Sequence, residues 1–194
     1  DLDLAYDIYN DIYSSNNDFK FNALIQICDI LAKKGDLDKA LELIEQNINL
    51  VYSDNSLKSN VIFKKLNLKK IEYLFYLGDY SLVLNELENQ IKLYDLSDKE
   101  LNDLLELKTI LISFNQNKIK FKNFLNIQYK INTNKIFESY SNLIELIDSE
   151  NILISELTQF QYCLIEVKKG NFIDVKKIIQ SMKDVTIFTE LSKI

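Results

Sequence analysis

The sequence predicts an all-α protein in which antiparallel helix pairs stack into an α-solenoid. Three observations lead to this fold class. Apolar residues recur at helical spacing along most of the 194-residue chain. Proline is absent and glycine occurs only three times, so few residues interrupt helices. Each glycine lies between two helical patterns and precedes a similar group of residues, which indicates a repeated helix–turn–helix unit.

The first half of the chain is expected to contain five helices. Between residues 23 and 31, apolar residues at i, i+3, i+4 and i+7 share one helix face: Leu24, Ile27, Cys28 and Leu31. The segment that follows repeats this spacing with Leu37, Ala40, Leu41, Ile44 and Ile48. A later segment does so with Leu82, Leu87 and Ile91. These patterns and the polar segments between them predict helices at 3–14, 18–34, 37–51, 56–77 and 80–94.

Five further helices are expected in the second half, at 98–115, 119–131, 134–148, 151–169 and 171–183, with a frayed tail after Asp184. The first of these has a helical pattern made by Leu101, Leu104, Leu105, Ile110 and Leu111. The isoleucine-rich segment 119–131 is the hardest to distinguish from a strand. Its apolar residues Phe121, Phe124 and Leu125 nevertheless step at helical spacing, which favours a helix.

The three glycines mark turns of the same kind. Gly35 opens Gly-Asp-Leu-Asp-Lys-Ala, Gly78 opens Gly-Asp-Tyr-Ser-Leu-Val and Gly170 opens Gly-Asn-Phe-Ile-Asp-Val. Glycine ends a helix in the left-handed conformation without a Cβ penalty. The following Asp or Asn is expected to accept from free N–H groups of the next helix. The small or β-branched residue that comes later in each turn lets the two helices approach closely: Ala40, Val83 or Val175.

These turns resemble those of the tetratricopeptide repeat family. With Gly35 at the family's turn glycine, Leu24, Ile27, Cys28 and Leu31 occupy the packing positions of the first helix. Ala40 then falls on the small position of the second helix and Ile44 on the large one, whereas Asn47 departs from the usual small residue. The resemblance implies a right-handed superhelix of antiparallel helix pairs and a groove that binds peptides.

The other glycine repeats match the family less closely. Around Gly78, three positions match the family (Ile71, Leu74 and Leu87) and three depart from it (Asn67, Lys70 and Val83). Around Gly170, Cys163 and Ile179 match, but Glu166 stands where an aromatic residue is usual. Both cysteines fall on the same repeat position and are expected to be buried free thiols.

The spacing of the glycines predicts four degenerate repeats. Gly35 and Gly78 are 43 residues apart, and Gly78 and Gly170 are 92 apart, whereas the family period is about 34. The helices are therefore longer than usual, and one repeat lacks its glycine. We expect repeats at about 18–52, 56–95, 98–131 and 150–183, in one helical-repeat domain over 1–194. Asn115 or Asn117 is the candidate left-handed cap of the third repeat.

The composition excludes the common catalytic and cofactor sites. The chain has no histidine, and its basic residues are all lysines, so neither a Ser-His-Asp set nor bidentate arginine capture of phosphate is available. Two distant cysteines without histidine do not make a zinc or iron site. Three separated glycines do not form a phosphate-binding loop. We therefore expect a non-enzymatic protein without a cofactor.

The first helices of two repeats carry the candidate binding residues. In the tetratricopeptide family, the exposed positions of these helices contact the ligand peptide. In this chain the corresponding residues are Asn22, Gln26, Asp29 and Lys33 in one repeat and Lys65, Lys69, Glu72 and Tyr76 in the next. Amide side chains suit an extended peptide because they both donate and accept hydrogen bonds. A solvated helix face is the alternative interpretation of these residues.

A lysine-rich segment is the second candidate surface. From Lys108 to Lys135 there are six lysines and no acidic residue, although the whole chain carries a net charge of -6. The candidates for a basic patch are Lys118, Lys120, Lys122, Lys130 and Lys135. Acidity overall and the lack of arginine argue against nucleic acid, so an acidic protein is the expected partner. Lysines on a solvated face with aromatic residues in the core would give the same pattern.

The function expected from these features is that of a scaffold or adaptor that binds a protein or peptide. The alternative is the ligand-sensing domain of a bacterial peptide-responsive transcription regulator whose DNA-binding domain is missing here, since the chain starts at Asp1 and is expected to be a fragment of a longer protein. No apolar segment is long enough to span a membrane. Few cysteines suggest a cytoplasmic location, and a homo-oligomer is compatible with the sequence.

Overall fold

The computed structural model describes residues 1–15, 18–53, 61–114, 117–133, 135, 138, 140–183, 186, 188 and 191. Within these ranges the chain forms ten α-helices and no β-strand. The all-α prediction is therefore confirmed. The isoleucine-rich segment 119–131, which was the hardest to distinguish from a strand, is helical. The chain packs as two compact units, Asp1–Leu105 and Glu106–Ile194.

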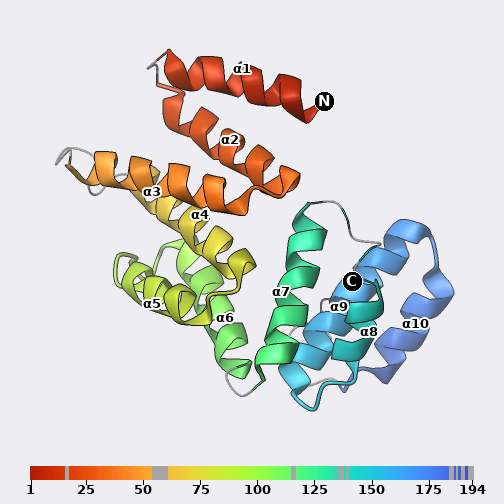
Figure 1. Ribbon diagram of the computed structural model, residues 1–194. Helices are drawn as coiled ribbons and strands as arrows, with labels where there is room; N and C mark the ends of the chain where they lie inside the picture. The colour runs from red at the N-terminus through yellow and green to blue at the C-terminus, as the bar shows by residue number, and fades with distance from the viewer. Residues whose placement is uncertain are drawn as a thin grey trace. The chain divides into compact units, whose positions relative to one another are not determined.

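The first unit is a row of helices that pack in chain order. It contains α1 (Leu2–Ser14), α2 (Lys20–Lys34), α3 (Leu37–Ser53), α4 (Val61–Leu77), α5 (Tyr80–Ile91) and the start of α6 (Lys99–Ser113). Each of α1 to α4 packs against the helix that follows it, and α2 also touches α4 (Figure 1). The first helices of two successive glycine hairpins are therefore neighbours.

The second unit is built in the same sequential way. After the end of α6 it contains α7 (Lys118–Asn132), α8 (Tyr140–Ile147), α9 (Ile152–Lys169) and α10 (Phe172–Ser181). Helices α7 to α10 pack against their neighbours in chain order. Asn115 lies outside the described residues. So does the predicted tail after Asp184, apart from residues 186, 188 and 191.

All three predicted glycine turns have the left-handed conformation, with φ of 97°, 83° and 77° at Gly35, Gly78 and Gly170. At Gly35, the glycine N–H bonds to the Ala32 carbonyl (3.1 Å) and the Asp36 N–H to the Leu31 carbonyl (2.9 Å). This pair of bonds is a Schellman motif, which satisfies carbonyls left open at the helix end. The prediction of left-handed glycine caps is confirmed.

The Asp or Asn that follows a glycine does not cap the next helix in every turn. Asp79 caps α5 as expected, because its carboxylate accepts from the Leu82 N–H at 3.0 Å. Asn171 makes no such cap bond, since its amide instead donates to Glu166 (2.8 Å) and Asp174 (2.6 Å). Asn117 is not the predicted left-handed cap. Its φ is -137°, and its side chain accepts from the Lys120 N–H as the N-cap of α7.

Gly35→Ala tests the turn geometry. A Cβ at this position meets no atom within 4 Å, so the only cost is the left-handed backbone conformation. We expect a loss of about 1–2 kcal/mol in the free energy of unfolding for alanine, and a smaller loss for Gly35→Asn, since asparagine tolerates this conformation. Urea unfolding followed by circular dichroism checks both values. Equal losses for the two variants would contradict a purely conformational cost.

The core of the first unit joins α2, α3 and α4. It contains buried residues from all three helices: Leu24, Cys28, Ala32, Ala40, Ile44, Val51, Leu66 and Tyr73. Ala40 and Val83, two of the predicted close-approach residues, are fully buried, whereas Val175 is only half-buried. The first-helix packing positions of the repeat around Gly35 therefore face the core.

Four polar departures from the repeat pattern are each satisfied inside the fold. The buried Asn47 and Asn67 amides donate to main-chain carbonyls four residues earlier, those of Leu43 and Phe63, both at 2.9 Å. Asn47 also accepts from the Tyr13 hydroxyl on α1 at 3.1 Å. Lys70 pairs with Glu86 at 2.9 Å and Glu45 at 3.3 Å, linking α4 to α5 and α3. Glu166, the fourth, belongs to a hydrogen-bonded cluster described below.

One predicted helix end lies three residues from its position in the structure. The predicted helix 80–94 ends at Ile91, because the N–H groups of Leu93 and Tyr94 bond carbonyls only three residues back and so form turns. No glycine marks the end of α5, and apolar spacing alone does not locate such a boundary. Of the predicted helix 134–148, the structure describes α8 at Tyr140–Ile147; residues 134, 136, 137 and 139 lie outside the described residues, as do residues 56–60 of the predicted helix 56–77.

The two cysteines are free and buried, as predicted. Burial raises the pKa of Cys28 to about 12 and that of Cys163 to about 11. Because the thiolate is the reactive form, both thiols should react with Ellman's reagent at pH 8 at least about 100-fold more slowly in the folded than in the unfolded protein, and Cys28 more slowly than Cys163. Rapid native labelling of either thiol would contradict its burial.

Candidate functional site

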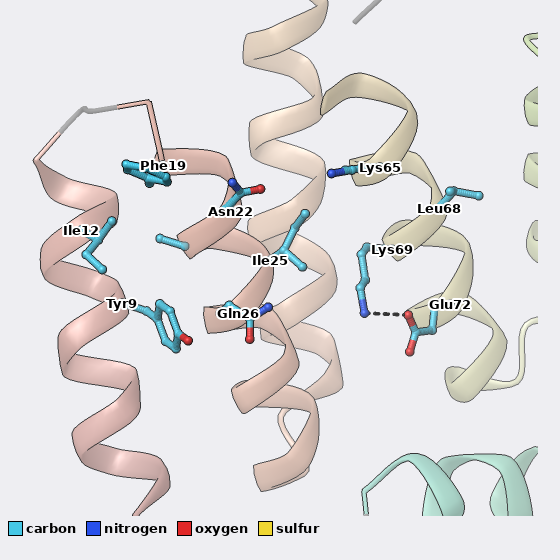
Figure 2. A pocket seen from close by; sticks show the side chains of 11 residues that line it. Tyr9, Ile12, Phe19, Asn22, Ile25, Gln26, Lys65, Leu68, Lys69 and Glu72 are labelled. Atoms are coloured by element: carbon cyan, nitrogen blue, oxygen red, sulfur yellow. Dashed lines mark hydrogen bonds and ion pairs between the residues drawn. The ribbon is translucent and has the colours of Figure 1, made fainter. Parts of the chain in front are cut away.

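An open pocket lies on the first unit between α1, α2 and α4. Its volume is about 750 Å³ (Figure 2). The polar part of its lining comes from α2 and α4: Asn22, Gln26, Lys65, Lys69 and Glu72. These residues stand one or two turns apart on their own helices, so each helix presents them on one face. The contact between α2 and α4 then brings the two faces to the same pocket.

The structure brings five of the eight predicted groove residues together, namely the five polar lining residues. Asp29 does not line the pocket but bonds to Lys69, which does. Lys33 is exposed and lies outside the pocket lining. Tyr76 packs against the core cluster instead, with its ring 5.8 Å from that of Phe75. The first helices of the two repeats thus share a pocket over about two turns.

A network of charged groups fixes one side of the pocket. The Lys69 ammonium lies 2.7 Å from the Asp29 carboxylate and 2.9 Å from that of Glu72. Burial by itself lowers the pKa of Lys69, but Glu72 and Asp29 outweigh burial and raise it above its usual value. The fully buried Tyr73 donates its hydroxyl to Asp29 at 2.9 Å. Lys69 is therefore charged and held between two carboxylates.

Three polar side chains of the pocket are available to a ligand. Asn22, Gln26 and Lys65 are exposed, and none of them makes a side-chain hydrogen bond or ion pair with another residue that the structure describes. The two amides can donate and accept, whereas the lysine only donates. In Figure 2, Asn22 and Lys65 point toward one another from opposite sides of the pocket.

An apolar part of the lining was missed by sequence reasoning. Tyr9 and Ile12 of α1, Phe19 just before α2, and Ile25 and Leu68 contribute it together with Ala23. Phe19 is 66% exposed, which is high for a large aromatic side chain. The helix 3–14 was predicted but assigned to no repeat, so its contribution to the pocket was not foreseen. In the sequence, only the recurrence of aspartates beside apolar residues in that helix indicated that it has an apolar face.

The structure describes the side chains of four of the five lysines of the predicted basic patch. Lys122 and Lys135 are exposed, and Lys120 is half-buried. Lys130 donates to the Glu138 carbonyl at 2.9 Å, so its charge has a structural role. The side chain of Lys118 lies outside the described residues. The interleaved Phe114, Phe121 and Phe124 are buried, and the ring centroids of Phe121 and Phe124 lie 5.6 and 4.9 Å from that of Phe114.

A buried carboxylate in the second unit, that of Glu166, accepts hydrogen bonds from neighbouring side chains. Glu166 accepts from Lys169 and Asn171, both at 2.8 Å. Burial by itself raises the pKa of Glu166, but hydrogen bonds from Lys169, Asn171 and Tyr140 outweigh it and lower the pKa. This carboxylate is ionised and joins the end of α9 to the start of α10. Its partners give it a structural role.

Two negative findings apply to the part of the chain that the structure describes. No group of three or more Cys, Asp or Glu side chains there is arranged to hold a metal ion. None of the described helices combines the length and apolar character that crossing a membrane requires.

Comparisons of the chain with protein-family models, curated proteins and solved structures found no significant match.

Proposed function

We propose that this chain is a non-enzymatic, tetratricopeptide-like helical-repeat module that binds an extended segment of another protein. Its glycine hairpins would continue as a right-handed superhelix, and the pocket between α1, α2 and α4 would be the binding groove. One observation carries the proposal. Five residues chosen from the sequence as ligand-contacting positions line a single pocket of about 750 Å³, a size typical of ligand sites.

The chemistry of the pocket suits an extended peptide. The amides of Asn22 and Gln26 have no side-chain partner among the described residues, stand one turn apart and can each bond a backbone N–H and C=O. The neighbouring apolar side chains Tyr9, Ile12 and Phe19 offer a surface for an apolar side chain of the same peptide. Such a combination of backbone hydrogen bonds and side-chain contacts is a recurring mode of peptide recognition.

Selection from a random-peptide phage library tests the proposal. The double variant Asn22→Ala/Gln26→Ala should lose binding of the selected peptides, because it removes the amides without disturbing buried residues. Gln46→Ala is the matched control, since Gln46 is an exposed amide on α3 outside the pocket. Fluorescence anisotropy compares the variants. A library that yields no binding peptide, or peptides that bind the double variant as well as the parent, would overturn the proposal.

A further inference from the structure

The two lysines that α4 presents to the pocket are in different electrostatic states. Lys69 is half-buried and lies within 2.9 Å of both Asp29 and Glu72. Lys65 stands one turn earlier, is exposed, and has no ion-pair partner among the residues that the structure describes. Lys69 is therefore neutralised within the fold, whereas the charge of Lys65 is open to a ligand.

Lys69 is not free to change partners. Asp29 holds it from α2, and Asp29 is itself fixed by the hydroxyl of Tyr73, a side chain with no exposed surface. Moving Lys69 toward a ligand would leave the partly buried Asp29 carboxylate without its cation, which is costly. In Figure 2, Lys69 is turned toward Glu72, away from Lys65.

We propose that the groove selects a segment with an internal Asp or Glu side chain, and that Lys65 is the residue that reads it. This inference rests on the proposed function. A carboxylate placed between Lys65 and Asn22 would accept from the ammonium and from the amide, which point toward one another. The exposed Phe19 and the half-buried Ile12 would contact an apolar residue beside the acidic one.

The Glu72 end of the α4 face disfavours a second acidic side chain in the bound segment. Glu72 follows Lys65 by seven residues, a rise of about 10 Å along the helix. An extended segment covers this distance in about three residues. The two carboxylates around Lys69 outnumber its one positive charge, so an acidic side chain there would be repelled. We therefore expect one acidic position in the bound segment, at the Lys65 end.

The experiment uses phage-displayed random peptides fused through their C-terminus, so that no free terminal carboxylate is present. Parent protein should enrich peptides with Asp or Glu beside an apolar residue. A selected peptide is then synthesised with an amidated C-terminus, in a Glu and a Gln version, and its binding is measured by fluorescence anisotropy. We expect the Glu version to bind the parent about fivefold more tightly than the Gln version, as for a partly exposed charge pair.

Variants of Lys65 and Lys69 show which of the two cations causes the preference for the Glu peptide. Lys65→Gln should remove the difference between the Glu and Gln peptides, and Lys65→Glu should favour a Lys version. Lys69→Gln should keep a preference for Glu at the same peptide position, and circular dichroism of each variant controls for folding. Peptides that need Asn22 and Gln26 but show no acidic enrichment would overturn this inference and leave the proposed function standing. A preference for the Glu peptide that survives Lys65→Gln would also overturn this inference and leave the proposed function standing. Failure to select any peptide would overturn both the inference and the proposed function.

Discussion

Replacing Leu87 with alanine is expected to lower the free energy of unfolding by about 2–5 kcal/mol. Leu87 lies on α5 and has no exposed surface. Shortening it removes apolar contacts and leaves a cavity that the surrounding close-packed side chains fill only in part. Urea denaturation followed by far-ultraviolet circular dichroism measures the loss.

Leu82→Ala is the matched control on the same helix. Both leucines belong to the apolar pattern that predicts this helix, but Leu82 is 48% exposed. Its truncation should change the free energy of unfolding by no more than about 0.5 kcal/mol. Equal losses for the two leucines would mean that the packing of α5 differs from that described.

Replacing Ala40 with phenylalanine is expected to have the second-largest effect, a loss of about 1–3 kcal/mol. Ala40 is fully buried on α3, in the cluster that contains Leu24 and Cys28 of α2. A phenyl ring at this position has no space and would force the two helices of the Gly35 hairpin apart. Thermal and urea unfolding should both show the destabilisation.

Lys39→Phe provides the control for Ala40→Phe, because it adds the same side chain at the preceding, exposed position of α3. Lys39 pairs with Asp36 at 3.3 Å, and most of its side chain is exposed. We expect a change of no more than about 0.5 kcal/mol. An unaltered stability of Ala40→Phe would show that Ala40 does not face a close partner helix.

The helices themselves were largely predictable because their causes are local. Main-chain hydrogen bonds within a helix join residues four apart, and apolar spacing shows which face is buried. The glycine turns were predictable for the same reason, since a left-handed φ depends on one residue. The end of α5 was not, because no glycine marks it and turn bonds that form in the folded chain set it.

The candidate site was predictable only in part. Placing Asn22, Gln26, Lys65, Lys69 and Glu72 on exposed helix faces needed only the repeat pattern. The pairing of Lys69 with Asp29 joins residues 40 apart in the chain, and the Tyr73 bond to Asp29 spans 44. No local spacing encodes such contacts. They depend on how α2 packs against α4.

For this protein, the sequence by itself determined the all-α class, the three left-handed glycine turns and the faces on which the polar pocket residues stand. Only the tertiary structure decided that α1 supplies an apolar part of the pocket, that Lys69 is neutralised and that Lys65 has no ion-pair partner among the described residues. It also decided that Leu87 is buried while Leu82 is exposed. The reason is physical: helix formation follows from interactions between near neighbours, whereas burial and charge pairing depend on which helices meet.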